Sequence, residues 1–242
     1  MKNVISVLNI TKSFKDLTAI NELSLEVSTG EIYGLLGSNG AGKSTTINIL
    51  LGFLKPDSGN ASINGIDTTS SFNDARKHIG YISENVNLYP YLSGIENLDY
   101  FSKLTGKNYS DKKLGEFLNK CGLDNSAHHR RTETYSKGMR QKVGIAIALA
   151  KEAKVYLLDE PASGLDPLAS NELSGLLRQL SSEGAAILMA SHDIFRVRQT
   201  CNRIGIINNG SLVKEMDTSE VSTKELENIY IEYMQNLSLI HI

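Results

Sequence analysis

The chain has 242 residues, enough for one full domain with a smaller lobe inserted into it. Its net charge of −2 gives no indication of a nucleic-acid-binding surface, and Cys121 and Cys201 are predicted to be free thiols in a reducing compartment. The longest uninterrupted apolar stretch, residues 143–150, is far shorter than the roughly 20 residues that span a bilayer, so we expect a cytoplasmic chain whose membrane contacts come through a partner.

The first part of the chain shows strand patterns followed by a helical one. Residues 4–14 and 17–27 alternate between apolar and polar side chains, which predicts two strands joined by a turn at Lys15 and Asp16. A short apolar run, 32–37, then enters a glycine-rich loop, and a helical pattern follows over 44–54. Further strands are predicted at 61–68, with a turn, and at 78–83.

The pattern becomes helical from about residue 84, and we expect an inserted helical lobe over 84–135. Two helices are predicted there, at 93–104 and 110–123, and each opens with a serine that can cap its first turn. Helices and strands alternate again afterwards, which predicts the α/β class. The predicted helices are 137–153 and 167–184, the strands 155–159 and 185–191, the Asn-Gly hairpin 204–215, and the last helix 223–237 within a short tail, 216–242.

The strongest motif lies between the strand 32–37 and the helix 44–54. It fits the pattern G-x-x-x-x-G-K-[ST] without a gap, in the strand–loop–helix context that a phosphate loop requires. Backbone N–H groups of such a loop point at phosphate oxygens, and the following helix adds its positive dipole end. Lys43 can reach the β- and γ-phosphates of ATP, and the Ser44 hydroxyl can ligate Mg²⁺. The residues of the motif are Gly37, Ser38, Asn39, Gly40, Ala41, Gly42, Lys43 and Ser44.

A pair of acidic residues ends the apolar strand 155–159. Carboxylates in this position lie at the carboxyl edge of a parallel sheet, where ligands bind in α/β folds. Asp159 is predicted to hold Mg²⁺, directly or through water, and Glu160 to act as general base towards the attacking water. By itself, such a pair is more often a solvated strand end. The prediction for Asp159 and Glu160 therefore depends on the presence of the phosphate loop in the same chain.

Two weaker signals follow other elements. His192 comes directly after the strand 185–191 and could donate to the γ-phosphate. By itself, it would be better explained as an exposed loop histidine. Ser136 precedes the helix 137–153 as an N-cap, and free N–H groups there would make a second anion site. An ordinary capped helix is the alternative. A second phosphate-binding helix start suggests that two chains share one nucleotide.

These motifs together resemble the ATP-binding subunits of ABC transporters, over roughly residues 4–215. GSNGAGKST, which ends at Thr45, is similar to the phosphate loop of the family, and YSKGMRQK is similar to its signature, with Lys137 in place of the first glycine and Met139 in place of glutamine. VYLLDEP resembles the second nucleotide motif, SGLD at 163–166 the D-loop, and His192 the switch histidine. Phe14 falls where the family stacks an aromatic ring on adenine, although an aromatic residue before a turn is commonly core.

The resemblance implies a single ABC-type ATPase domain over 1–242, with a P-loop NTPase core, a parallel sheet, an N-terminal antiparallel β subdomain and the helical lobe. It further implies a head-to-tail dimer in which Ser136, Gly138 and Met139 of one chain cover the ATP of another copy or a homologous subunit. A membrane-spanning permease is the expected second partner, docked on the helical lobe, and the signature and short tail resemble the exporter-type branch. Glu84 departs from the usual glutamine of the Q-loop; it can still ligate Mg²⁺, but its charge changes that position.

Other classes share only parts of this pattern. A small-molecule kinase has the phosphate loop but no reason to carry YSKGM or SGLD. A chromosome-maintenance or repair ATPase needs a long coiled coil between the two nucleotide motifs, and no sustained heptads lie between Lys43 and Asp159. A translation-linked ATPase of the family usually carries two heads in one chain, and a pure binding protein would not need Glu160.

Overall fold

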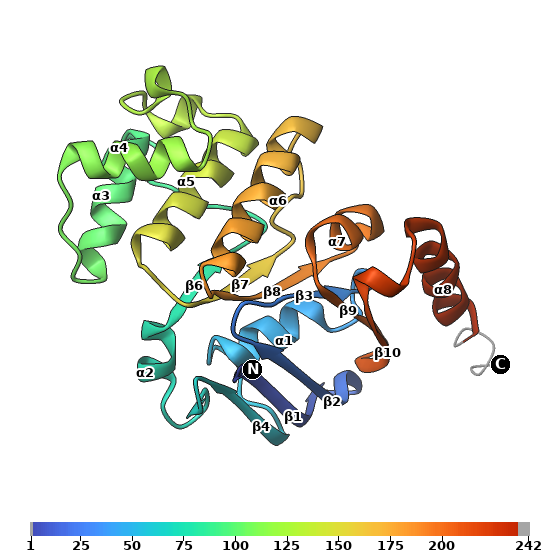
Figure 1. Ribbon diagram of the computed structural model, residues 1–242. Helices are drawn as coiled ribbons and strands as arrows, with labels where there is room; N and C mark the ends of the chain where they lie inside the picture. Colours follow the sequence, from blue (N-terminus) through green and yellow to red (C-terminus); the bar gives the residue numbers. More distant parts are fainter. Residues whose placement is uncertain (1, 237–242) are drawn as a thin grey trace.

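The computed structural model describes residues 2–236, which form two β-sheets with helices around them (Figure 1). Residues 237–242 of the predicted tail lie outside the described residues. The smaller sheet has the strand order β2-β1-β4-β5 and is antiparallel. Its strands are β1 (Asn3–Phe14), β2 (Leu17–Ser28), β4 (Ser58–Ile63) and β5 (Ile66–Asp67). The predicted N-terminal β subdomain is therefore confirmed, with the run 61–68 divided between β4 and β5.

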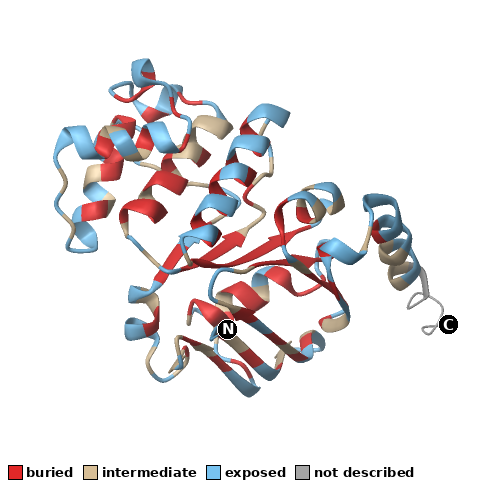
Figure 2. Cartoon of the chain, in the orientation of Figure 1, coloured by how far each residue is buried: buried red, intermediate tan, exposed pale blue. Residues whose placement is uncertain are grey.

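The larger sheet has the order β10-β9-β3-β8-β7-β6, and its five strands from β9 to β6 run parallel. β10 pairs with β9 as the predicted hairpin. Figure 2 shows the central strands buried along their length, as expected for a sheet covered on both faces. The strands are β3 (Ile32–Leu36), β6 (Ile79–Ile82), β7 (Val155–Asp159), β8 (Ala186–Ser191), β9 (Arg203–Asn208) and β10 (Ser211–Asp217).

The helices cover both faces of the larger sheet. One hydrophobic cluster joins α1 to the antiparallel sheet and to one face of the parallel sheet, and another joins the remaining long helices to the opposite face. Tyr33 and Leu35 belong to the first cluster and Ile32 and Leu36 to the second, because successive side chains of a strand alternate. The helices are α1 (Lys43–Leu50), α2 (Phe72–Lys77), α3 (Gly94–Leu104), α4 (Asp111–Lys120), α5 (Lys137–Ala150), α6 (Pro167–Ser182), α7 (Ile194–Thr200) and α8 (Thr223–Asn236).

Helices α3 and α4 form where the helical lobe was predicted. Ser93 caps α3 in a capping box with Glu96, and Ser110 caps α4. Leu98 and Leu114 share one hydrophobic cluster with Val143 of α5, so the lobe packs on α5. The division of the chain at residues 84 and 135 stays a prediction.

Several bounds differ from the sequence pattern. α1 ends at Leu50, short of residue 54, and Gly52 follows with φ +67°. α4 and α5 likewise end three residues before the predicted positions, at Lys120 and Ala150. The sequence did not predict α2 or α7, because helices of two turns or less show no clear period.

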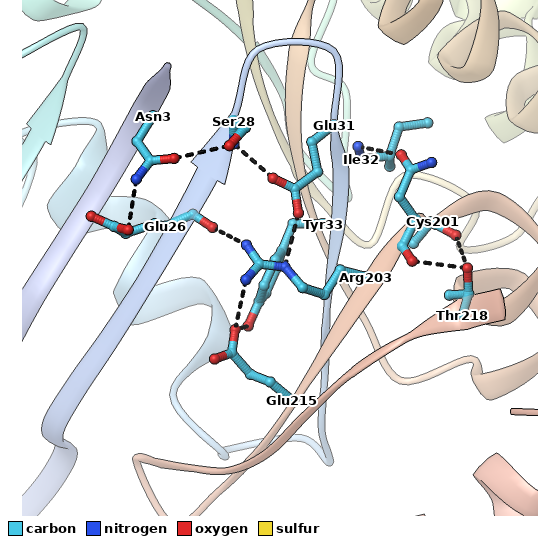
Figure 3. A network of polar contacts seen from close by, with 11 residues as sticks. Asn3, Glu26, Ser28, Glu31, Ile32, Tyr33, Cys201, Arg203, Glu215 and Thr218 are labelled. Carbon is cyan, nitrogen blue, oxygen red and sulfur yellow. Dashed lines mark hydrogen bonds and ion pairs between the residues drawn. The ribbon is translucent and has the colours of Figure 1, made fainter. Parts of the chain in front are cut away.

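A network of hydrogen bonds and ion pairs centred on Arg203 connects the two sheets (Figure 3). Arg203 Nε donates to Glu31 Oε1 at 2.9 Å, and its guanidinium also donates to the carbonyl of Glu26 in β2. The buried Tyr33 hydroxyl donates to Glu215 Oε1 of β10 at 2.7 Å. Burial, followed by the charge of Glu215, raises the pKa of Tyr33, so the phenol stays protonated and remains a donor.

Candidate active site

Residues 37–42 form a tight loop between β3 and α1. Gly40 and Gly42 have φ of +84° and +106°, a region that glycine enters without steric cost. At Gly42 a side chain is also excluded by space, because a Cβ would lie 2.6 Å from the carbonyl oxygen of Ala19. The loop thus delivers the chain to the N-terminus of α1, where Lys43 is the first helical residue.

A cavity of about 170 Å³ lies over this loop at the carboxyl edge of the parallel sheet. It brings together residues from the loop, from the start of α1, and from the segments just after β6 and β7. The lining residues are Ser38, Asn39, Gly40, Gly42, Lys43, Ser44, Thr45, Glu84 and Glu160. Gly37 and Ala41 lie in the loop behind this surface and are buried.

Lys43 supplies a buried positive charge to the cavity. Its side chain is 5% exposed, and Nζ donates to the carbonyl oxygens of Gly37 and Ser38 at 2.7 and 3.0 Å. Nζ also lies 3.5 Å from Glu160 Oε1. An ammonium held in this way, by weak neutral acceptors and one carboxylate, can turn towards a phosphate that enters the cavity.

Asp159 and Ser44 meet beside Lys43. Ser44 Oγ donates to Asp159 Oδ1 at 3.1 Å. Burial raises the pKa of Asp159, and the charges of Glu160 and Glu84 add to the rise, whereas the Ser44 bond opposes it. A hydroxyl and a carboxylate crowded by further negative charge suit a hard divalent cation such as Mg²⁺. Within residues 2–236 no group of three or more His, Cys, Asp or Glu side chains could hold a metal.

Glu160 places an unsatisfied oxygen at the cavity. Its side chain is 12% exposed, and Oε1 is buried and accepts no hydrogen bond from the described part of the chain. His192 Nδ1 lies 2.9 Å from this oxygen, and Ser191 Oγ donates to Oε2 at 3.3 Å. Buried acceptors normally have a partner, so Oε1 offers a place for a water molecule. His192 itself is 56% exposed at the end of β8.

The remaining predicted residues do not line this cavity. Ser136 caps α5, accepting from Met139 N at 3.2 Å; Ser136 is exposed, and Gly138 and Met139 are partly exposed. Phe14 ends β1 with 43% of its surface exposed and with Lys12 Nζ 5.5 Å from its ring centroid. Phe14 is therefore a surface residue, and the alternative that it belongs to the core is wrong.

Residues 20–163 match the family model described as ABC transporter. This match covers more than half of the chain. The chain belongs to the ABC transporter family. It is an ATP-binding and ATP-hydrolysing subunit with the P-loop NTPase fold, and ATP-binding subunits of this family dimerise and work with membrane permeases. Among the described residues, no helix is both long and apolar enough to cross a membrane.

Relatives of this ABC subunit are similar to it in sequence or structure over most of its length. It is 37% identical to YhcH, an ABC transporter ATP-binding protein of Bacillus subtilis (strain 168), over 97% of this chain and 77% of that one. It is also 37% identical to SrtF, a lantibiotic transport ATP-binding protein of Streptococcus pyogenes, over 90% of this chain and 93% of that one. The solved ATP-binding cassette MJ0796, a dimer in a post-hydrolysis state with ADP and Pi, superposes with a TM-score of 0.82 at 27% identity and covers 88% and 98% of the two chains.

Two serines of the ABC subunit contact site carboxylates without having been predicted to do so. Ser191 donates to Glu160, as described above, and Ser163 Oγ donates to Glu84 Oε1 at 3.2 Å. Ser191 ends a predicted strand beside His192, which is a usable signal. Ser163 opens the SGLD motif, but that motif gave no indication of a contact with Glu84, because the contact depends on how β6 and β7 are placed in the sheet.

Proposed function

We propose that this ABC subunit binds Mg²⁺-ATP in the cavity over residues 37–45 and hydrolyses it when a second subunit covers the nucleotide. The observation that carries the proposal is that Lys43 and Glu160 line one cavity at the carboxyl edge of the sheet, together with Ser44, which donates to Asp159. Lys43 and the loop N–H groups bind the phosphates. Ser44 and Asp159, with Glu84 beside them, provide ligands for Mg²⁺, which neutralises phosphate charge when bound.

Glu160 is the proposed general base. Its Oε1 atom lies 3.5 Å from Lys43 Nζ and 2.9 Å from His192 Nδ1. A water bound beside Oε1 therefore lies between the phosphates, which Lys43 binds, and the Glu160 carboxylate, which accepts its proton. His192 positions this water and the γ-phosphate. Phe14 stacks on the adenine ring, for which its exposure leaves room.

The second subunit contributes the start of α5. Ser136, Gly138 and Met139 present the capped N-terminus of this helix to solvent, away from the cavity of their own chain. In a head-to-tail dimer the start of α5 in each chain therefore contacts the ATP bound by the other chain. The dimer of the MJ0796 cassette supports such an assembly.

A permease is the proposed partner on the membrane side, and export is the proposed direction. An apolar groove of about 320 Å³ lies between the end of α1, α2, β6, α3 and α5. Phe53 and Leu104 line it with 60% and 66% of their surface exposed, and Tyr81 connects it to the end of β6 that carries Glu84. A permease segment in this groove would thus touch the strand that leads to the nucleotide. The name of SrtF, a lantibiotic transport protein, favours a lantibiotic-like cargo.

Glu160→Gln tests the central proposal. Glutamine keeps the shape and can still hydrogen-bond a water, but it cannot accept the proton, so base assistance of about 10²–10⁴-fold is lost. Because Lys43, Ser44 and Asp159 are untouched, ATP binding survives and the variant accumulates as a dimer in ATP and not in ADP, as size-exclusion chromatography will show. Hydrolysis at the wild-type rate would exclude Glu160 as the base. A variant that neither hydrolyses nor dimerises would instead favour a single-chain site.

A further inference from the structure

The segment 163–166 connects the nucleotide cavity to the start of α5 within one chain. Ser163 Oγ donates to Glu84 Oε1 at 3.2 Å, and Lys137 Nζ donates to Ser163 Oγ at 3.4 Å. The alkyl part of Lys137 covers Gly164, where a Cβ would lie 2.8 Å from Lys137 Cδ. Gly164 has φ +74°, a conformation that favours glycine.

The chemistry of these groups decides which of them donates and which accepts each hydrogen bond. A lysine ammonium can only donate hydrogen bonds and an ionised carboxylate can only accept them, whereas a serine hydroxyl has one proton and can accept as well. With Lys137 donating to its oxygen, the Ser163 hydroxyl turns its single proton towards Glu84. Bonds arranged in such a chain polarise and strengthen one another.

The position of Glu84 matters because it lines the phosphate cavity. Three carboxylates, those of Asp159, Glu160 and Glu84, already lie near the buried positive charge of Lys43. A bound triphosphate adds further negative charge to this site. A Glu84 carboxylate that left its place beside Ser44 and Asp159 and turned towards the phosphates would repel them. Held by Ser163, the same carboxylate lies against the segment 163–166, with the charge of Lys137 behind it.

We propose that Lys137 is a positioning residue for the ATP site of its own chain: through Ser163 it holds the Glu84 carboxylate in place and so keeps the cavity open to Mg²⁺-ATP. The inference rests on the ATP site proposed above. It adds a role within the chain to the start of α5, whose proposed role so far is in the partner's site. The effect is on binding, so Lys137 changes the apparent affinity for ATP more than the rate of hydrolysis at saturation.

Lys137→Met tests this, because methionine keeps the alkyl contact with Gly164 and removes the donor. Binding of a fluorescent ATP analogue with Mg²⁺ is measured at protein concentrations where sedimentation gives a monomer, so that no partner chain contributes. We expect about fivefold weaker binding for Lys137→Met and for Ser163→Ala, and near wild-type binding for Lys137→Arg, which keeps a donor. Lys142→Met is the matched control: Lys142 is on the same helix but pairs with Glu172, and its loss leaves ATP binding unchanged.

The Glu84→Gln background decides whether the effect passes through Glu84. There, Lys137→Met is expected to have no further effect, since no charged carboxylate remains to be held. Unchanged monomer affinity in Lys137→Met, or an equal loss in the Glu84→Gln background, would overturn the proposal. Failure of the ATP site itself is separate: it would appear as unchanged nucleotide affinity in Lys43→Ala.

Discussion

At the scale of single residues, Glu160 combines backbone strain with an unsatisfied side chain. Its φ of +48° lies in the left-handed region, which costs a residue with a side chain on the order of 1–3 kcal/mol. The backbone holds it there: Glu160 N donates to Ala190 O of β8 at 3.0 Å, and Glu160 O accepts from Ser163 N at 3.0 Å. In this conformation Oε1 lies 2.9 Å from His192 Nδ1 and accepts no hydrogen bond from the described residues.

Phe14 gives a test of nucleotide binding at the residue scale. Phe14→Ala is expected to weaken the binding of ATP and ADP alike by about 1–3 kcal/mol, because the adenine stack is common to both nucleotides. Isothermal titration with each nucleotide measures this. Leu17→Ala is the control, since Leu17 pairs with Phe14 across the turn and is 67% exposed. Unchanged affinities in Phe14→Ala would remove the stacking role.

At the scale of elements, the Arg203 network joins β2, β3, β9 and β10. Tyr33→Phe removes only the hydroxyl that donates to Glu215 Oε1, while the ring stays in the core. Because this hydrogen bond has a charged acceptor that water can still partly reach, we expect the free energy of unfolding to fall by about 1–2 kcal/mol. Urea denaturation measures the change.

Tyr230→Phe is the matched control for that experiment. Tyr230 in α8 is half-buried, and its hydroxyl has no hydrogen-bond partner among the described residues. Its loss should change the free energy of unfolding by less than about 0.5 kcal/mol. Equal effects of the two substitutions would show that the Tyr33 hydroxyl contributes nothing specific.

The groove between α1, α3 and α5 makes a second prediction at this scale. Phe53→Asp places a charge on an exposed apolar wall, so the subunit should lose its membrane partner while binding ATP as before. Co-purification with the permease and ATP titration of the free subunit measure the two effects. Leu8→Asp changes an equally apolar, 51% exposed residue on the antiparallel sheet and should leave the complex intact. Loss of the partner in both variants would argue against the groove.

At the scale of the whole molecule, the two parts of the proposed nucleotide site lie apart within one chain. The cavity lies over residues 37–45, and the capped start of α5 lies outside its lining. We expect a monomer without nucleotide and weak dimerisation with ATP, since the free energy of closure comes largely from the bound nucleotides. Sedimentation with and without ATP measures this, and a stable dimer in both conditions would contradict it.

Gly138→Asp provides the matched variant for dimerisation. A Cβ at Gly138 meets its nearest neighbour, Leu165 Cδ2, at 3.4 Å, so the monomer tolerates a side chain there. A carboxylate at the start of α5 would repel the partner's triphosphate. This variant should bind ATP as a monomer but fail to dimerise.

The sequence by itself determined the phosphate loop, the strand that ends in Asp159 and Glu160, and most of the regular elements. These features are local: residues 37–45 of the loop are consecutive, and the apolar pattern of a helix or strand lies within its own segment of the sequence. Only the tertiary structure decided that Phe14 is exposed, that α7 forms, and that Glu84, Ser163 and Lys137 touch. Those contacts depend on the order of strands in the sheet, which places residues far apart in the chain side by side and leaves no period in the sequence.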